Sequence, residues 1–292
     1  MTESPPKPEL DGRKHGLFTR MMHGFTGASF VEGPLRTPYE ASKGVDVHIA
    51  HLSKSFSGHQ VLHDINLDIR AGETFSIIGP SGTGKSVLLK HLAKLVRPNE
   101  GEIEIGGCSI LSPAPSADAG AYRYSMVFQS SALFNSLTVG ENVGLWLREK
   151  QVCSEARVRR IIREKLRLVG LAGKEEVPTS ELSGGMKKRV AIARSLAMNP
   201  DLILYDEPTA ELDPVTSDEL ARVIQNLKQQ VNLTTIIVTH DLNFAMYLSD
   251  RIAMISDGRI VEIGTPDEIK ASQNPLVRNF IYTTTKGIKG ED

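Results

Sequence analysis

The stretch that decides the fold is Gly79-Pro80-Ser81-Gly82-Thr83-Gly84-Lys85-Ser86, which fits the phosphate-binding pattern G-x-x-x-x-G-K-[ST]. The apolar run 74–78 precedes it and predicts a buried strand, and apolar residues at helical spacing follow it from Val87 onward. In this setting, glycines let backbone N–H groups converge on an anion at a helix N-terminus. We expect Lys85 to reach the β- and γ-phosphates of a nucleotide and the Ser86 hydroxyl to bind Mg²⁺. For this motif alone, an ordinary glycine-rich turn is the other interpretation.

Length and composition exclude several classes of protein. The 292 residues are enough for one or two domains. The 34 Lys and Arg residues balance 35 Asp and Glu residues, which does not indicate a nucleic-acid-binding protein. The two cysteines, Cys108 and Cys153, cannot form a metal site alone, and they favour a reducing, cytoplasmic setting. No run of about 18 apolar residues predicts a membrane span, and the N-terminus lacks the apolar segment of a secretory signal.

Changes in composition along the chain predict its domain organisation. Residues 1–44 are rich in Pro, Gly, Ser and charge, and we expect a flexible or surface-draped extension. The globular domain is expected at 45–270, followed by a C-terminal tail at 271–292. Helical periodicity, which begins at Leu133, predicts a helical subdomain at about 132–198 within that domain.

Short segments of alternating apolar residues predict strands in the first part of the domain. They lie at 45–49 and 61–69, and 103–105 adds another short strand. Together these segments predict a small antiparallel sheet beside the phosphate-binding loop. Phe56 lies between the first two, where it either stacks on an adenine ring or belongs to the core.

Polar residues follow apolar runs at four points of the chain. These strand ends carry Gly79, Gln129, the pair Asp206 and Glu207, and His240. Continuous apolar strands that alternate with helices predict a parallel sheet covered on both faces, and ligands of such sheets bind beyond the carboxyl ends of the strands. We therefore expect these residues at one rim. One carboxylate can serve Mg²⁺, the other can orient or deprotonate water, and the amide and imidazole can position water and the γ-phosphate. Taken singly, Gln129 and His240 also fit polar residues that merely end strands.

From about residue 45 to about residue 281, the chain resembles the nucleotide-binding subunits of ABC transporters. Besides the motifs above, it contains Leu182-Ser183-Gly184-Gly185-Met186, which resembles the signature of that family and is absent from other P-loop proteins. The resemblance implies an α/β fold, with a P-loop NTPase (RecA-like) core, an antiparallel β subdomain and an inserted α-helical subdomain. It also implies ATP and Mg²⁺ as cofactors and ATP hydrolysis as the reaction.

The resemblance also implies a role for each site residue. Phe56 would stack on adenine, and the phosphates would be held by Gly79, Pro80, Ser81, Gly82, Thr83, Gly84, Lys85, Ser86 and Val87. Mg²⁺ would be bound by Ser86, Gln129 and Asp206. Glu207 would be the catalytic base, assisted by Gln129 and by the switch histidine, His240. The stretch Glu211-Leu212-Asp213 looks like the D-loop, and the ATP of a second copy would be held by Ser183, Gly184 and Gly185.

The signature has a physical rationale of its own. Ser183, Gly184 and Gly185 begin a predicted helix, and a helix N-terminus attracts anions. The cations at 187–189 follow at once and would repel that N-terminus unless an anion faced it. We therefore expect a γ-phosphate to relieve this repulsion, and the other interpretation is a solvated basic turn.

Smaller features indicate the branch of the family. Met186 and Val87 stand where most members have other residues, and together with the stretches 128–134 and 274–280 they look like the ATPases of MCE-type lipid transporters, the Mla and Mce systems. We expect a peripheral subunit on the cytoplasmic face of the inner or plasma membrane, whose partners are an integral-membrane permease, a second copy of itself and an MCE-domain protein. Thr209-Ala210 is common to many importers, so the ATPase of a polar amino-acid importer is an alternative. A soluble non-transport ABC ATPase and a non-catalytic regulator are others.

Large apolar side chains lie close to Gln129 in the predicted helical region, namely Leu133, Phe134, Leu137 and Trp146. They either line a groove for a cytoplasmic helix of the permease or belong to the core of the subdomain itself. We expect the groove.

Overall fold

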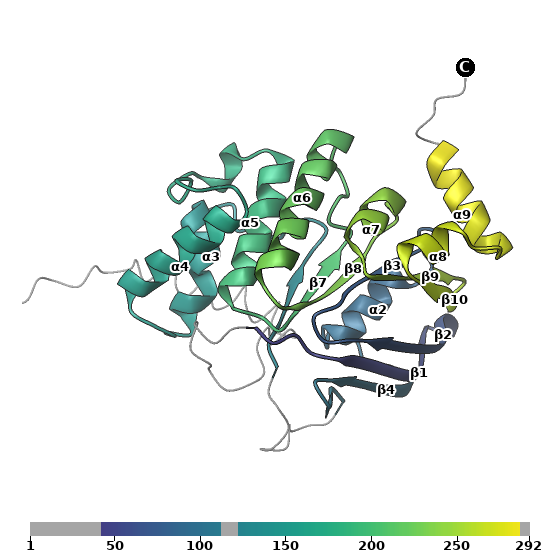
Figure 1. Ribbon diagram of the computed structural model, residues 1–292. Helices are drawn as coiled ribbons and strands as arrows, with labels where there is room; N and C mark the ends of the chain where they lie inside the picture. The colour runs from purple at the N-terminus through teal and green to yellow at the C-terminus, as the bar shows by residue number, and fades with distance from the viewer. Residues whose placement is uncertain (1–41, 112–121, 287–292) are drawn as a thin grey trace, which may run out of the picture.

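The computed structural model describes residues 42–111 and 122–286 and contains two sheets (Figure 1). The four-stranded sheet has the order β2-β1-β4-β5, and the six-stranded sheet has the order β10-β9-β3-β8-β7-β6. Nearly all of the predicted N-terminal extension lies outside the described residues. The first sheet consists of β1 (Val47–Phe56), β2 (His59–Ile69), β4 (Glu100–Ile105) and β5 (Cys108–Ser109).

The four-stranded sheet is antiparallel, as its alternating sequence predicts. In β2, Leu62, Ile65 and Leu67 are buried while the residues between them are partly or fully exposed. A two-residue turn, Ser57 (φ 48°) and Gly58 (φ 83°), joins β1 to β2, and both residues have the positive φ that tight hairpins favour.

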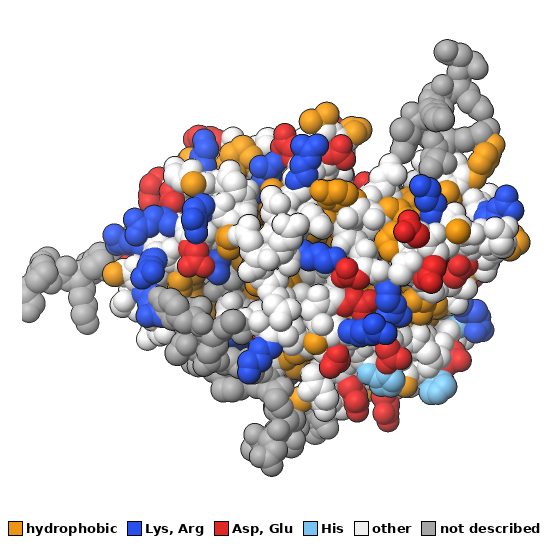
Figure 2. All heavy atoms as spheres, viewed as in Figure 1, with side chains coloured by type: hydrophobic (Ala, Val, Ile, Leu, Met, Phe, Trp, Pro, Cys, Tyr) orange, Lys and Arg blue, Asp and Glu red, His pale blue; other side chains and the backbone are white. Residues whose placement is uncertain are grey.

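The outer face of this sheet is polar. On the face drawn in Figure 2, histidines gather over the sheet among acidic and basic side chains. His51 pairs with Asp64 at 2.8 Å, and His48 pairs with Asp68. A sheet with one solvated face needs such polar side chains, which leave the opposite face free for the core.

The six-stranded sheet brings four strand ends to one edge. Strands β9, β3, β8, β7 and β6 run parallel to one another, and β10 pairs antiparallel with β9. Its members are β3 (Thr74–Ile78), β6 (Tyr124–Val127), β7 (Leu202–Asp206), β8 (Thr234–Val238), β9 (Arg251–Ser256) and β10 (Arg259–Gly264). Because β3, β6, β7 and β8 are parallel, the residues that follow them meet at the same edge of the sheet.

Helices cover both faces of the six-stranded sheet, which is the predicted α/β arrangement. The helices are α2 (Lys85–Leu92), α3 (Val139–Glu149), α4 (Glu155–Leu168), the 3₁₀ turn η1 (Thr179–Glu181), α5 (Gly184–Ala197), α6 (Pro214–Gln230), α7 (Leu242–Leu248), α8 (Pro266–Lys270) and α9 (Pro275–Lys286). Alternate residues of β7 enter different cores: Leu204 packs with α2 and the antiparallel sheet, whereas Ile203 and Tyr205 pack with α5, α6 and α7. In Figure 1, α3, α4 and α5 form the end of the molecule opposite α8 and α9.

Two segments differ from the sequence-based expectation. The first helix of the helical region begins at Val139 and not at Leu133, because Thr138 and Glu141 form a capping box there. Helix α9 occupies much of the segment expected as a tail, and its Val277 and Phe280 are buried against α7, α8 and β9. This helix is therefore part of the folded core.

Within residues 42–111 and 122–286, no helix is long and apolar enough to cross a bilayer.

Candidate active site

A cavity of about 350 Å³ opens at the edge where the parallel strands end. Its walls come from the phosphate-binding loop, from the first turn of α2, from Val61 in β2 and from the residues that follow β6, β7 and β8. The lining residues are Val61, Ser81, Gly82, Gly84, Lys85, Ser86, Val87, Gln129, Glu207, Ala210 and His240. The predicted rim therefore exists, and Gln129, Glu207 and His240 face the loop across it.

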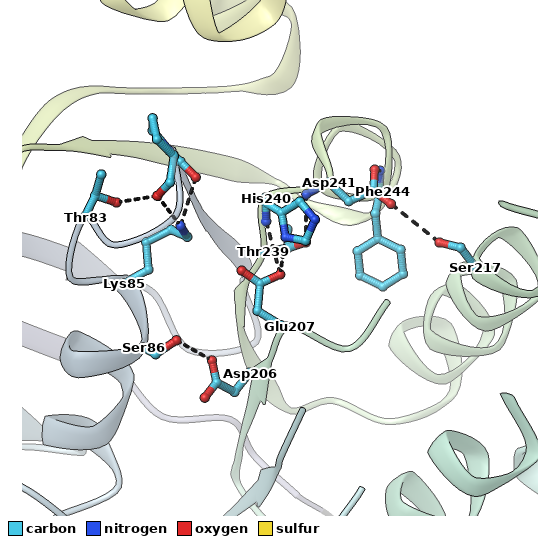
Figure 3. A network of polar contacts seen from close by, with 12 residues as sticks. Thr83, Lys85, Ser86, Asp206, Glu207, Ser217, Thr239, His240, Asp241 and Phe244 are labelled. Carbon is cyan, nitrogen blue, oxygen red and sulfur yellow. Dashed lines mark hydrogen bonds and ion pairs between the residues drawn. The ribbon is translucent and has the colours of Figure 1, made fainter. Parts of the chain in front are cut away.

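Lys85 is held beside the loop by backbone oxygens. Its ammonium donates to the carbonyl oxygens of Gly79 and Pro80, at 2.8 Å each (Figure 3). Burial lowers the pKa of Lys85, while the carboxylates of Glu207 and Asp206 act in the opposite direction. A phosphate entering the cavity would thus meet a desolvated cation whose position is already set.

The start of α2 is left open to an anion. Gly84 occupies the N-cap position with φ 95° and, as a glycine, has no side chain that could cap the first turn. The first N–H groups of a helix have no partner within the helix, so they are available to a ligand in the cavity. Gly79 is required for another reason: a Cβ atom there would lie 2.1 Å from the carbonyl oxygen of Ile255.

Ser86 and Asp206 present oxygen atoms that suit Mg²⁺. The Ser86 hydroxyl donates to Oδ1 of Asp206 at 2.7 Å, although the two residues lie 120 positions apart (Figure 3). Among the described residues, no group of three or more His, Cys, Asp or Glu forms a ready-made metal site. A hydroxyl and a single carboxylate match the usual mode of Mg²⁺ binding, in which phosphates and water supply the remaining ligands. Gln129, the third predicted metal ligand, is exposed at the same cavity.

Glu207 and His240 form a pair at the cavity wall. Oε2 of Glu207 lies 2.8 Å from Nδ1 of His240 and also accepts from the backbone N–H of His240 at 3.2 Å (Figure 3). A carboxylate only accepts, so the proton of the ring belongs on Nδ1. Glu207 has φ 47°, which is uncommon for a residue other than glycine, and such strain is typical of active sites. The backbone N–H of Glu207 donates to the carbonyl oxygen of Val238 at 2.8 Å, which holds this conformation.

Phe56 lies at the end of β1 and is 43% exposed, which rules out the alternative of a core residue. The ammonium of Lys54 lies 4.9 Å from the centre of its ring. Phe56 does not line the cavity, so adenine stacking stays a prediction for it.

The signature residues do not line the cavity of their own chain. Ser183 is the N-cap of α5, and its hydroxyl accepts from the backbone N–H of Met186 at 3.3 Å. The neighbours of Gly184 and Gly185 are Leu212 and Thr216, from the D-loop and the first turn of α6. The fold therefore sets Ser183, Gly184 and Gly185 apart from the phosphate-binding loop.

Two of the three cations after the signature have partners within the chain. Lys188 is only 4% exposed and donates to the backbone oxygen of Gln129, while Arg189 pairs with Glu219. Their positive charges already have acceptors within the chain. Lys188 and Arg189 have these partners because α5 packs against the segment after β6 and against α6. That a γ-phosphate relieves the repulsion at the start of α5 stays a prediction. Lys187, the third of these cations, is partly exposed.

Sequence reasoning missed several residues of the site. Val61 and Ala210 line the cavity, and Lys188 and Arg194 bind the backbone beside Gln129. Val61 and Ala210 carry no functional group that a motif could reveal. Lys188 and Arg194 lie on a predicted helix, but only the packing of α5 shows what they bind.

Comparison with known proteins places the chain in a family. The family model described as "ABC transporter" matches residues 62–210. The chain belongs to the ABC transporter family. It is an ABC ATPase, and its cofactors are ATP and Mg²⁺. The sequence-based prediction of fold, cofactor and ATP hydrolysis is confirmed.

Relatives of this ABC ATPase have several names. It is 40% identical over 239 residues to the "probable ribonucleotide transport ATP-binding protein mkl" of Mycobacterium leprae, a match that covers 82% of this chain and 69% of that protein. It is 38% identical over 268 residues to TRIGALACTOSYLDIACYLGLYCEROL 3, chloroplastic, of Arabidopsis thaliana, a match that covers 85% of this chain and 76% of that protein. It is also 40% identical over 242 residues to the spermidine/putrescine import ATP-binding protein PotA of Thermotoga maritima, a match that covers 82% of this chain and 64% of that protein.

A solved structure agrees with the fold. The dimeric, post-hydrolysis state of the ATP-binding cassette MJ0796 bound to ADP and Pi superposes with a TM-score of 0.66 at 33% identity, covering 75% of this chain and 98% of that one.

Proposed function

We propose that this ABC ATPase drives lipid transport by an MCE-type system, as a peripheral subunit on the cytoplasmic face of the membrane. The observation that carries the proposal is the match to the Arabidopsis protein, which is named for a glycerolipid and is covered over 76% of its length. Met186 and Val87, together with the stretches around Gln129 and in α9, resemble the ATPases of MCE-type transporters and support the same branch.

The arrangement of the site supports hydrolysis between two copies of the chain. Ser183, Gly184 and Gly185 lie away from the cavity of their own chain, at the N-terminus of a helix, where they are suited to face the phosphates in a second copy. The dimeric MJ0796 cassette with ADP and Pi is a precedent for such a pair. A second copy is therefore proposed as a partner.

Each residue of the cavity has a proposed task in this reaction. The open start of α2 and the Lys85 ammonium hold the phosphates, while Ser86, Asp206 and Gln129 are the proposed ligands of Mg²⁺, which supplies charge neutralisation when bound. Glu207 accepts a proton from the attacking water. The two hydrogen bonds from His240 orient the Glu207 carboxylate for that step.

Coupling to a permease is proposed at the segment that follows Gln129. Leu133, Phe134, Leu137 and Trp146 are all partly exposed, so none of them is a fully buried core residue. Leu133 and Trp146 pack against the core of the helical region with part of their surface. The exposed parts of these side chains are suited to a cytoplasmic helix of a permease.

Phe134→Ala is expected to separate docking from stability. Because Phe134 is only partly buried, we expect its free energy of unfolding to fall by less than about 1.5 kcal/mol, while association with the permease weakens. The matched control is Leu147→Ala in α3, which is fully buried and should cost about 2–5 kcal/mol. Urea unfolding and co-purification with the permease measure the two effects. A large loss of stability for Phe134→Ala with normal assembly would contradict the groove.

The lipid assignment is tested on the assembled system. The full chain, tagged and purified from the membranes of its source organism, is expected to bring a permease and an MCE-domain protein with it. Phospholipid in the reconstituted complex should raise ATP turnover, whereas ribonucleotides, polyamines and polar amino acids should not. Co-purification with a solute-binding protein for a polar amino acid or polyamine would contradict the proposal, and the match to PotA makes an importer the second candidate.

A further inference from the structure

The segment that follows β6 is held mainly by the helical region. The amide of Asn142 in α3 donates to the carbonyl oxygens of Phe134 at 3.1 Å and Leu137 at 3.4 Å, and its Oδ1 accepts from the backbone N–H of Phe134 at 2.9 Å. The hydroxyl of Thr179 lies 3.3 Å from the carbonyl oxygens of Phe134 and Leu137. Asn142 and Thr179 are both fully buried, so these bonds are shielded from water.

Two cations of α5 bind the beginning of the same segment. Lys188 donates to the backbone oxygen of Gln129. Arg194 donates through Nη1 to the carbonyl oxygen of Ala132 at 2.7 Å and through Nη2 to that of Ser131 at 3.0 Å. Because charged side chains are seldom buried without a partner, and hydrogen bonds to charged groups are the stronger ones, these contacts set where the segment lies.

The backbone conformation of the segment depends on these contacts. Ser131 (φ 61°) and Ala132 (φ 45°) are consecutive residues in the left-handed region, which residues other than glycine rarely adopt. Such a conformation persists only where the surroundings hold it. Here Arg194 binds both carbonyl oxygens, and the N–H of Ser131 donates to the oxygen of Phe128 at 2.9 Å.

The Lys188 ammonium lies near two carboxylates of the site, those of Glu211 and Glu207. Burial lowers its pKa, while the carboxylates of Glu211 and Glu207 act in the opposite direction. The Lys188 ammonium therefore contacts the backbone of Gln129 and is also stabilised by the charges of Glu211 and Glu207.

The chain passes from the sheet to the helical region within two residues. Val127 still pairs with Tyr205 in the six-stranded sheet, whereas Gln129 is bound by Lys188.

We propose that Lys188, supported by Arg194, is a positioning residue that ties Gln129 to α5. Lys188 thereby fixes the backbone from which the side chain of Gln129 reaches the cavity. This inference rests on the role proposed above for Gln129 in the hydrolysis of ATP.

The test compares Lys188→Met, which keeps the volume and removes the charge, with Lys188→Arg, which restores a donor. In the full chain, we expect kcat for ATP to fall roughly tenfold in Lys188→Met, with the Kd for a fluorescent ATP analogue and the Tm nearly unchanged. Lys188→Arg should recover most of the turnover. Lys150→Met, at the exposed C-terminal end of α3, is the matched control and should behave as the parent.

A double-mutant cycle with Gln129→Ala identifies the route. If Lys188 acts through the side chain of Gln129, Lys188→Met should cost little further turnover in the Gln129→Ala background. Independent, multiplying losses would overturn the inference, and so would parental turnover in Lys188→Met or a loss of turnover that merely follows a lower Tm and lost ATP binding. Parental turnover in Gln129→Ala would instead reject the proposed role of Gln129 itself.

Discussion

Helices α2 and α5 both begin after a turn rich in serine and glycine, yet the two turns are built differently. Before α2, Gly84 has φ 95°, and no side chain caps the first turn. Before α5, Ser183 has φ −64°, and its hydroxyl already accepts a hydrogen bond from Met186. The N-terminus of α2 is therefore open to a ligand in the cavity of its own chain, whereas the N-terminus of α5 already has a side-chain cap.

This difference shows that the site around the start of α2 is complete within one chain, whereas the site around the start of α5 is not. The start of α2 has a cavity, a cation and a Mg²⁺-compatible pair of oxygens around it. The start of α5 lies outside that cavity, and its Gly184 and Gly185 lie beside Leu212 and Thr216. The proposed second copy would supply what α5 lacks, and four substitutions test the contrast.

Glu207→Gln is expected to have the largest effect, because an amide cannot accept the proton of the attacking water. Turnover should fall roughly 10²–10⁴-fold while ATP still binds at both helix starts. The variant should therefore accumulate as a dimer, which sizing chromatography with ATP and Mg²⁺ detects. Glu164→Gln, on the exposed face of α4, is the control. A strictly monomeric Glu207→Gln variant under these conditions would argue against a shared site.

Lys85→Ala removes the cation from the first helix start only. Because Lys85 is the buried ammonium of the loop, its loss should lower ATP turnover roughly 10²–10³-fold. Lys90→Ala, exposed on the same helix, should leave turnover at the parental level. Steady-state hydrolysis by Lys85→Ala within a few-fold of the parent would remove the loop from the mechanism.

Gly185→Ala tests the packing of the second helix start. A Cβ atom there would lie 2.3 Å from Cγ2 of Thr216, so we expect a loss of about 1–3 kcal/mol in the free energy of unfolding. Thr216→Ser removes that methyl group and should rescue the variant. Gly184→Ala is the control, since its Cβ atom would lie 3.5 Å from the nearest side chain. Urea unfolding compares the variants, and equal costs for both glycines would mean that Thr216 moves aside freely.

Ser183→Ala should have the smallest effect on folding. Loss of the cap costs about 1 kcal/mol, and Ser183→Gly should cost only a few tenths. If Ser183 also binds the ATP of a second copy, the dimer formed by Glu207→Gln should weaken on adding Ser183→Ala. An unchanged dimer would leave Ser183 with a capping role alone.

Much of the fold was accessible from local patterns. The period of two in β2, the continuous apolar runs of β3, β7 and β8, and the serine before α5 predicted their elements because each pattern reflects contacts within one segment. The predicted start of the first helix of the helical region was wrong. The apolar residues from Leu133 suggested a helix there, but the stronger signal was the capping box at Thr138. Helix α9 was missed because its burial depends on α7 and α8.

By itself, the sequence determined the phosphate-binding loop, the polar strand ends, the signature and hence the family. Each of these features can be identified within one short segment of the chain. Only the tertiary structure decided that the Ser86 hydroxyl donates directly to Oδ1 of Asp206 and that Lys188 and Arg194 hold the backbone beside Gln129. The physical reason is that such contacts follow from the strand order β3-β8-β7-β6 and from the packing of α5, which residues far apart in the chain settle jointly.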